Sequence, residues 1–347
     1  MDLASLAASI DAGAELTPEQ VRFAASQLAG SDAAPTAKEI FLESLARRGE
    51  TPGEIAGFAV AFRELARDPG LGEWAPRAID VCGTGGDKSG SFNISTVVGF
   101  VLAAAGVPVI KHGNRSITSK CGSADLLERL GIRLDVEGDR LRRSMEALNF
   151  VFLFAPAYHP AFREIVPVRK ALAARGVRTV FNLLGPLLNP ARPAHQIMGI
   201  FSEAFVGAAA GALDQLGLEA GYVVHSVDEE GHAYDELTAC GRDIAVGFGR
   251  LRGTRIDAES EAFGVPRGRT ADLAGGDVEA NVRLLDEMLA GNGPRALVDS
   301  ILLNAAAGLH AVGRVESIAA GIEPARELLT GGAVRSWLDR ARAFYGE

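Results

Sequence analysis

Short β-type runs alternate with helix-length segments along most of this chain, beginning at residue 76. The expected strands lie at residues 78–81, 107–111, 132–136, 150–155, 196–201, 222–225 and 244–248, and the expected helices at 95–106, 122–131, 138–148 and 203–217. This alternation predicts an α/β fold with a mainly parallel central sheet. Ligands of such sheets bind at the carboxyl ends of the strands.

The first 75 residues show a different pattern, in which apolar residues recur at helical spacing and no convincing strand appears. Residues 17–20 and 51–54 each place Thr at the N-cap, Pro at the first helical position and Gln or Glu at the third. Turn-forming residues are concentrated between 68 and 76. The beginning of the chain is therefore predicted to be a small helical bundle.

We accordingly predict two domains, a small helical domain over residues 1–75 and a large α/β domain over residues 76–347. Residues 161–193 interrupt the strand rhythm and are expected to pack on the helical domain. From about Val278 onward, three or four helices are expected to finish the chain.

Charge and cysteine content limit the classes of function. The 347 residues carry a net charge of −9, so no general field attracts nucleic acid or an anionic membrane. The longest apolar run, residues 97–110, has 14 residues and is interrupted by Gly and Pro, which argues against a signal peptide or a membrane span. Cys82, Cys121 and Cys240 form no CxxC pair, so we expect neither a zinc ribbon nor a disulfide framework, and a reducing, cytoplasmic location.

A glycine-rich loop follows the first expected strand. Four glycines lie within the eight residues from Gly83, and Asn93, Ser95 and Thr96 then begin an apolar helix. The backbone N–H groups of such a loop, together with the helix N-terminus, can hold a phosphate or pyrophosphate. No P-loop or GxGxxG signature is present, so a tight turn with an ordinary N-cap remains the alternative interpretation.

A second polar loop follows the next expected strand. The thirteen residues from Lys111 contain three fixed cations, four hydroxyls and two glycines, a concentrated anion site in an acidic protein. The alternative interpretation is a solvated basic loop. Two such loops after successive strands favour a phosphate-containing ligand.

These two loops carry a family resemblance. The runs GTGGD, KSGSFNIST, KHGNR and SITSKCGSADLLERLG, followed by FLFAPAYHPAF and VRTVFNLLGPLLNP, closely resemble the anthranilate phosphoribosyltransferase family, and KEIFLESLARRGETPGEIAGF resembles its first helical region. The resemblance covers most of the chain. It implies a nucleoside phosphorylase/phosphoribosyltransferase-like fold, a homodimer, and transfer of phosphoribose from phosphoribosyl pyrophosphate (PRPP) to the amine of anthranilate with Mg²⁺, in tryptophan biosynthesis.

The resemblance also implies site residues. Those expected around PRPP are Gly83, Gly86, Asp87, Ser91, Asn93, Ile94, Ser95, Thr96, Lys111, His112, Gly113, Asn114, Arg115, Ser116, Ile117, Thr118, Ser119 and Ser123. Gly83, Asn114 and Arg169 would face anthranilate, and His159, like His112, is given only a supporting role. Ser95, Asp235 and Glu236 would contact magnesium, with two ions per subunit.

Several positions depart from the family pattern. Asp228 and Glu229 compete with Asp235 and Glu236 as the acidic metal pair. The segment 170–177 is about three residues longer than the resemblance leads us to expect, so Arg178 competes with Arg169 for anthranilate. Thr118 and Cys121 stand where serine is commoner; Cys121 has no adjacent base and is interpreted as a packed residue rather than a nucleophile.

The inferred reaction asks for positioning and charge stabilisation more than for acid–base chemistry. Positive charge develops on the ribose while the C1–O bond to pyrophosphate loosens, and the neutral aromatic amine already has a free lone pair. We therefore assign no catalytic base. Less favoured alternatives are a phosphoribosyltransferase for a different aromatic amine, a pyrimidine-nucleoside phosphorylase and a non-enzymatic nucleic-acid binder.

Overall fold

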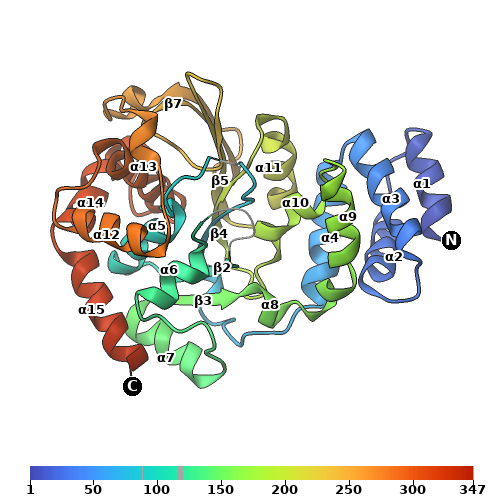
Figure 1. Ribbon diagram of the computed structural model, residues 1–347, viewed down its shortest axis with the longest axis horizontal. Coiled ribbons are helices and arrows are strands. Elements are labelled where there is room, and N and C mark those ends of the chain that lie inside the picture. The colour runs from blue at the N-terminus through green and yellow to red at the C-terminus, as the bar shows by residue number, and fades with distance from the viewer. Residues whose placement is uncertain (88, 116–119, 347) are drawn as a thin grey trace.

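The computed structural model of the chain describes residues 1–87, 89–115 and 120–346 (Figure 1). Four helices, α1 (Leu3–Asp11), α2 (Pro18–Ala29), α3 (Pro35–Arg48) and α4 (Pro52–Glu64), form a bundle at one end of the molecule. At the opposite end lie α12 (Val278–Leu289), α13 (Arg295–Ala311), α14 (Ile318–Thr330) and α15 (Ala333–Gly346). Within the described ranges, no helix is both long and apolar enough to cross a membrane.

The helix starts predicted in the bundle are confirmed. Thr17 accepts a hydrogen bond from the N–H of Gln20 at 3.3 Å, and the Gln20 side chain accepts one from the N–H of Thr17 at 2.8 Å. Thr51 and Glu54 make the same reciprocal pair at the start of α4. Each pair satisfies two N–H groups that a helix otherwise leaves without partners, so both helices begin where the sequence places them.

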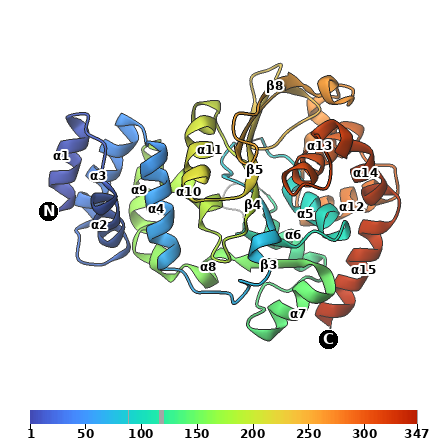
Figure 2. The same cartoon turned by 180° about the vertical axis from the view of Figure 1, so that it is seen from behind.

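A sheet of eight strands, counted over the described residues, crosses the middle of the molecule (Figure 2). The strands are β1 (Ile79–Gly83), β2 (Val109–Gly113), β3 (Phe150–Phe154), β4 (His195–Gly199), β5 (Ala220–Asp228), β6 (Ala233–Tyr234), β7 (Gly241–Gly249) and β8 (Arg255–Glu259). Their order is β3-β2-β1-β4-β5-β7-β8, with β6 paired to β5. The first five strands along the chain are mutually parallel, and β6, β7 and β8 join antiparallel, so the expected α/β class with a mainly parallel sheet is confirmed.

The strand order reverses between β1 and β4, which makes this point the topological switch point of the sheet. From β1 the chain moves outward through β2 to β3, and it then returns to place β4 on the other side of β1. The last residues of the two central strands, Gly83 and Gly199, pair directly. The carboxyl ends of strands at such a reversal form the usual ligand crevice of open α/β sheets.

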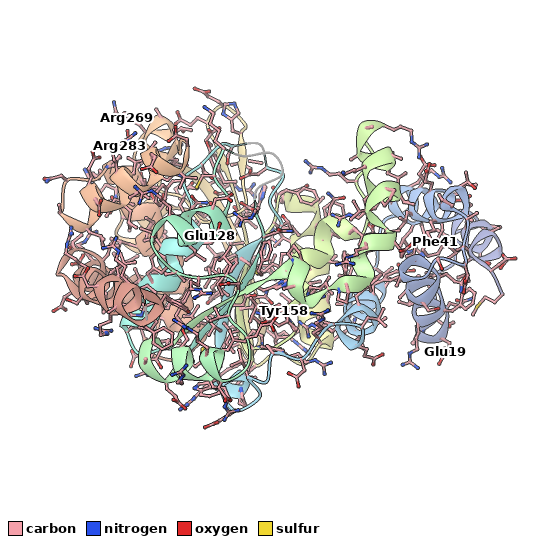
Figure 3. All side chains as sticks on the ribbon, turned by 60° about the horizontal axis from the view of Figure 1, so that its bottom comes forward. Glu19, Phe41, Glu128, Tyr158, Arg269 and Arg283 are labelled. Carbon is pink, nitrogen blue, oxygen red and sulfur yellow. The ribbon has the colours of Figure 1, made fainter. Side chains whose placement is uncertain are left out.

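Helices cover both faces of the sheet. On one face, α5 (Ile94–Ala104) packs with α13 and α15, and Phe100 stacks on Trp337 with ring centroids 5.0 Å apart. On the other face, α11 (Val206–Gln215) packs on β5 and β7, and α4 packs on α11. The helices α9 (Val166–Ala174) and α10 (Phe181–Leu184) join the same apolar cluster, where Phe62 packs on Phe181 at 5.3 Å. Figure 3 shows Phe41 within the helical bundle and Tyr158, in α8 (Ala155–Tyr158), between the bundle and the sheet.

One predicted strand was wrong, and two short strands, β6 and β8, were not predicted. Residues 132–136 do not join the sheet, although Ile132, Leu134 and Val136 are buried in alternation as expected. They form an extended connection between α6 (Ser123–Arg129) and α7 (Asp139–Leu148), so the alternation reflects burial of one side without a strand partner. Strand β8 was not predicted, because its alternate residues are exposed and its sequence is mostly charged.

Candidate active site

Asp235 lies across the carboxyl ends of the two central strands. A Cβ atom added at Gly83 would come within 2.2 Å of the Asp235 carboxylate, and one added at Gly199 within 1.6 Å of the Asp235 carbonyl oxygen. The N–H of Gly85 donates to Asp235 Oδ2 at 2.7 Å. Glycine is therefore required at the ends of β1 and β4 because the backbone and carboxylate of Asp235 occupy the space of a side chain.

Glu236 points to the start of α5. Its Oε1 accepts a hydrogen bond from the N–H of Ser95 at 3.3 Å, and the positive end of the helix dipole faces its charge. Its Oε2 is buried and has no hydrogen-bond partner among the described residues. One oxygen of this carboxylate is thus held by the protein and the other is left for a ligand.

Burial and neighbouring carboxylates raise the pKa values of both acids. Removal from solvent, together with the neighbouring carboxylate of Asp87, raises the pKa of Asp235 to about 7. The pKa of Glu236 is raised well above its usual value by burial and by the charges of Asp235 and Asp87. Without a cation, the site therefore keeps protons on carboxyl groups that would ordinarily be ionised at neutral pH.

Lys111 brings one positive charge under this acidic cluster. The side chain is 2% exposed, and its ammonium donates to Ser95 Oγ at 3.2 Å and to the carbonyl of Val81. Burial lowers the pKa of Lys111, while the nearby carboxylates, Asp80 first among them, act in the opposite direction. Lys111 is therefore fixed where the first loop, the second strand and the acidic pair meet.

The first loop has the backbone conformation that its glycines predict. Gly85, Gly86 and Gly90 have φ angles of 63°, 76° and 65°, which other residues rarely adopt. The hydroxyl of Ser89 donates to Asp87 Oδ2 at 2.8 Å, which fixes the turn internally. The loop ends at the N-terminus of α5, the place where backbone N–H groups bind phosphate oxygens.

Asn93 joins the two loops instead of capping α5. Its Nδ2 donates to the carbonyl of Cys121 at 3.1 Å, and its Oδ1 accepts from Asn281 Nδ2 at 2.9 Å. Asn281 is 1% exposed and also accepts from the N–H of Gly276 at 2.7 Å. An asparagine of α12 therefore fixes the point where both loops touch.

The second loop is described in part. Asn114 accepts from the N–H of Arg115 at 2.8 Å, and Arg115 pairs with Asp125 at 2.7 Å and with Glu128 of α6 at 2.6 Å. Ser123 donates to the carbonyl of Asn114 at 3.2 Å. The predicted contacts at Ser116, Ile117, Thr118 and Ser119 lie outside the described residues.

The two histidines near this loop form a buried pair. Their Nε2 atoms are 3.2 Å apart. Burial, together with the neighbouring His159, lowers the pKa of His112 to about 3, and burial lowers the pKa of His159 to about 4. Both rings are therefore neutral at physiological pH and do not supply a proton to a leaving group.

The two competing arginines occupy different surroundings. Arg178 donates to the carbonyl of Gly86 at 3.0 Å and lies 4.0 Å from the centre of the Phe201 ring. Arg169 is half-buried, lies 5.4 Å from the Phe181 ring centre, and has its pKa lowered by burial. Arg178 thus contacts the first loop directly, whereas the structure records no such contact for Arg169.

The competing acidic pair, Asp228 and Glu229, belongs to the hairpin between β5 and β6. Asp228 is 6% exposed and accepts hydrogen bonds from the N–H groups of Glu230 and His232, at 3.0 and 2.8 Å, and from the hydroxyl of Tyr234 at 3.2 Å. Burial acts to raise the pKa of Asp228, but the hydrogen bonds from His232 and Tyr234 outweigh it and lower the pKa. Glu229 pairs with Arg267 at 3.1 Å. These contacts explain the two acids as parts of the turn between β5 and β6.

The residues that hold the acidic pair in place were not predicted from the sequence. Asn304 of α13, which is 2% exposed, accepts from the N–H of Leu237 at 3.1 Å and donates to the carbonyl of Leu237 at 2.8 Å. Ser226 donates to the carbonyl of Glu236 at 2.7 Å. An asparagine inside an apolar helix is the only signal in the sequence, because a buried amide there needs polar partners.

The chemistry of these donors fits a divalent cation. Two adjacent carboxylates with raised pKa values and one unpartnered oxygen would be stabilised by a hard cation. No three His, Cys, Asp or Glu side chains form a complete ligand set in the part of the chain that the structure describes. Such a set suits an ion that takes further ligands from water and from substrate phosphates.

A glycine-rich loop and a helix N-terminus at a strand reversal, flanked by carboxylates, fit an α/β protein that binds a phosphate-containing ligand together with a cation. The family described as "Glycosyl transferase family, a/b domain" matches residues 75–335. The anthranilate phosphoribosyltransferase of Deinococcus radiodurans is 44% identical over 295 residues, covering 84% of this chain and 83% of that protein. The chain belongs to the anthranilate phosphoribosyltransferase family.

Solved structures agree over the whole length. The anthranilate phosphoribosyltransferase of Thermus thermophilus has a TM-score of 0.87 and 38% identity, with complete coverage of both chains. The Saccharomyces cerevisiae protein, solved in complex with PRPP and Mg, has a TM-score of 0.84 and 25% identity over 99% of this chain and 98% of that one. The small helical region and the α/β region are therefore both shared with this family.

Proposed function

We propose that this chain transfers the phosphoribosyl group of PRPP to the amine of anthranilate, giving N-(5-phosphoribosyl)anthranilate and pyrophosphate, a step of tryptophan biosynthesis. The observation that carries the proposal is the position of Asp235 over Gly83 and Gly199, beside Glu236 at the start of α5. The acidic pair, the glycine-rich loop and the N-terminus of α5 therefore lie together at one switch point of the sheet. Family membership supports the same activity.

In this proposal, PRPP occupies the two loops. The binding residues are Gly83, Gly86, Asp87, Ser91, Asn93, Ile94, Ser95, Thr96, Lys111, His112, Gly113, Asn114, Arg115, Ser116, Ile117, Thr118, Ser119 and Ser123. Ser95, Asp235 and Glu236 would hold Mg²⁺, with two ions per subunit. When bound, the metal neutralises charge on the pyrophosphate and supplies electrostatic stabilisation of the leaving group.

The chain's own groups position the reactants and stabilise charge. The ammonium of Lys111 and the loop N–H groups face oxygens that become more negative as the C1–O bond breaks. The aniline nitrogen attacks with its own lone pair, so no side chain is assigned as a base. The rest of the rate enhancement comes from holding the amine within reach of C1 and from excluding water.

Anthranilate is assigned to Gly83, Asn114 and Arg169, with Arg178 as the competing cation for its carboxylate. The loss of one guanidinium distinguishes them. If Arg169 binds the carboxylate, Arg169→Ala raises KM for anthranilate about tenfold or more, while KM for PRPP changes little. A larger increase of KM for anthranilate in Arg178→Ala would assign the carboxylate to Arg178, which contacts Gly86 of the first loop.

The domain boundary, the oligomer and the location belong to the same proposal. The helical domain comprises residues 1–75, with 161–193 packed on it, and the α/β domain comprises 76–347; the contact of Phe62 with Phe162 at 5.1 Å supports this grouping. The chain is a homodimer through its helical domain. No disulfide joins Cys82, Cys121 and Cys240, which is consistent with a cytoplasmic location.

The test is the loss of anthranilate fluorescence when the protein is mixed with PRPP and Mg²⁺. Turnover that requires all three components supports the proposal. No turnover by folded protein that binds PRPP would indicate a different aromatic amine as acceptor. No PRPP binding at all would contradict the enzyme assignment.

A further inference from the structure

A second cavity lies at the opposite end of the sheet from the two loops. It has a volume of about 250 Å³ and is formed by the end of α4 and by residues that immediately precede β4 and β5. These segments are at the amino ends of strands whose carboxyl ends face the proposed PRPP site. In Figure 2, α11 lies between α4 of the helical bundle and the sheet.

One wall of this cavity carries a buried guanidinium. Arg63 is 9% exposed, and its Nε donates to the carbonyl of Leu187 at 2.5 Å. Among the described residues, the negative charge that acts on Arg63 comes from Asp80, and no ion pair joins the two. Its electrostatic neighbour Asp80 is already bonded to Asn189 at 2.9 Å and to the N–H of His112 at 3.3 Å. A buried charge without a bonded counter-ion is costly, so this side chain is suited to binding an anion.

A second guanidinium lines the same cavity. Arg192 has a φ angle of 54°, a left-handed conformation that costs a non-glycine residue energy. Its positive charge also acts on Arg63, whose pKa falls to about 10, mainly because of burial. Two like charges are thus held near each other by the fold. A local strain combined with like-charge repulsion indicates a site that an anion would stabilise.

The rest of the lining restricts the anion. Val60, Leu216 and Leu218 supply apolar surface, and Glu64 places one negative charge in the same cavity. Two arginines and one glutamate leave a balance of one positive charge, which suits a monoanion better than a phosphate carrying several charges. The apolar walls require a ligand with an apolar body.

We propose that this cavity binds a small carboxylate with an apolar body, whose carboxylate is held by Arg63 and Arg192. The two guanidiniums accept a planar carboxylate by paired hydrogen bonds, and the apolar residues cover the remainder of the ligand. The cavity shares no residue with the proposed PRPP and anthranilate sites. Binding there is therefore independent of the proposed transfer reaction.

Benzoate and its neutral counterpart benzamide test this site by isothermal titration calorimetry of the full chain without PRPP. We expect benzoate to bind with a dissociation constant at least tenfold lower than that of benzamide. Arg192→Ala should weaken benzoate binding at least tenfold, and Glu64→Gln should strengthen it. Arg22→Ala, which removes an exposed arginine of α2, is the matched control and should have no effect.

Variants of the other site exclude binding there. Arg169→Ala and Arg178→Ala should leave benzoate binding within twofold of wild type. Binding that is lost in either of these variants and kept in Arg192→Ala would overturn the proposal, as would equal binding of benzamide. Equal binding of inorganic phosphate would overturn the assignment to an apolar carboxylate. Arg63→Lys, checked for folding by thermal unfolding, should weaken binding because one ammonium cannot reproduce the paired contact.

Discussion

Two acidic pairs lie close together in the sequence and have opposite environments. At Asp228, the hairpin between β5 and β6 provides hydrogen bonds from two N–H groups and a tyrosine hydroxyl, and the pKa is lowered. At Asp235, one N–H bond from Gly85 is outweighed by removal from solvent and by Asp87, and the pKa rises to about 7. The hydrogen bonds of the hairpin stabilise the charged form of Asp228, whereas the single bond to Asp235 does not compensate for its burial.

The difference teaches how to separate a structural carboxylate from one available to a cation. A carboxylate whose hydrogen-bonding capacity is met by the chain stabilises the fold and has little to offer a metal. Carboxylates crowded together with an unpartnered oxygen are destabilised until a cation or a proton neutralises them. Four experiments probe this contrast, in decreasing order of effect.

The largest effect is expected from neutralising the crowded pair. Asp235→Asn with Glu236→Gln should lower kcat/KM for PRPP by about 10³-fold, because both the metal and the charge stabilisation of pyrophosphate are lost. Steady-state kinetics of anthranilate consumption measures this. Near-normal turnover in the double variant would show that the metal pair lies elsewhere.

The single substitution Asp235→Asn should increase stability when no metal is present. The folded pKa of Asp235, about 7, is above the unfolded value of 3.8, so its stabilising proton is lost as pH rises from about 4 through 7. Asp235→Asn should therefore raise the free energy of unfolding at pH 8 by at most about 4 kcal/mol. Urea unfolding in EDTA at pH 8 and pH 4 measures the difference, which should vanish at the lower pH.

A smaller catalytic effect is expected from Asn304, which holds Leu237 next to the acidic pair. Asn304→Ala should lower kcat/KM for PRPP by about 10- to 100-fold, corresponding to roughly 1.4–2.7 kcal/mol, and shift the Mg²⁺ concentration needed for half-maximal rate upward. Ser300→Ala is the matched control, because Ser300 bonds the N–H of Ala239 further along the same segment at 2.9 Å. An equal effect of both variants on Mg²⁺ dependence would argue for a general structural role.

The smallest catalytic effect is expected from replacing Asp228. Asp228→Asn should destabilise the fold by about 1–3 kcal/mol, since the hydrogen bonds that its charged carboxylate accepts are weakened. Turnover in the folded variant should stay within about threefold of wild type, because no charge is lost at the loops. Thermal unfolding and kinetics on one preparation separate the two effects. Loss of turnover in a fully folded Asp228→Asn would reverse the assignment.

Local chemistry was predictable from the sequence. The Thr-Pro starts of α2 and α4 and the glycine loop after β1 depend on short segments whose preferences the fold respects. Residues 132–136 show the limit, because alternating burial predicts an extended segment but does not say whether a strand partner exists.

Long-range positioning could not be predicted in the same way. Asn281 and Asn93 are 188 positions apart in sequence, and Asn304 and Leu237 are 67 apart, so no local pattern connects them. The need for glycine at Gly199 likewise arises from the Asp235 backbone arriving from another segment. These contacts exist only once the sheet has brought the C-terminal helices to the loops.

The most direct test of the central claim is anomalous diffraction from crystals grown with Mn²⁺ and PRPP, collected near the manganese edge. We expect a peak at coordination distance from the carboxylates of Asp235 and Glu236, and none at Asp228 or Glu229. A peak at the hairpin pair, with the crowded pair left without metal, would contradict it.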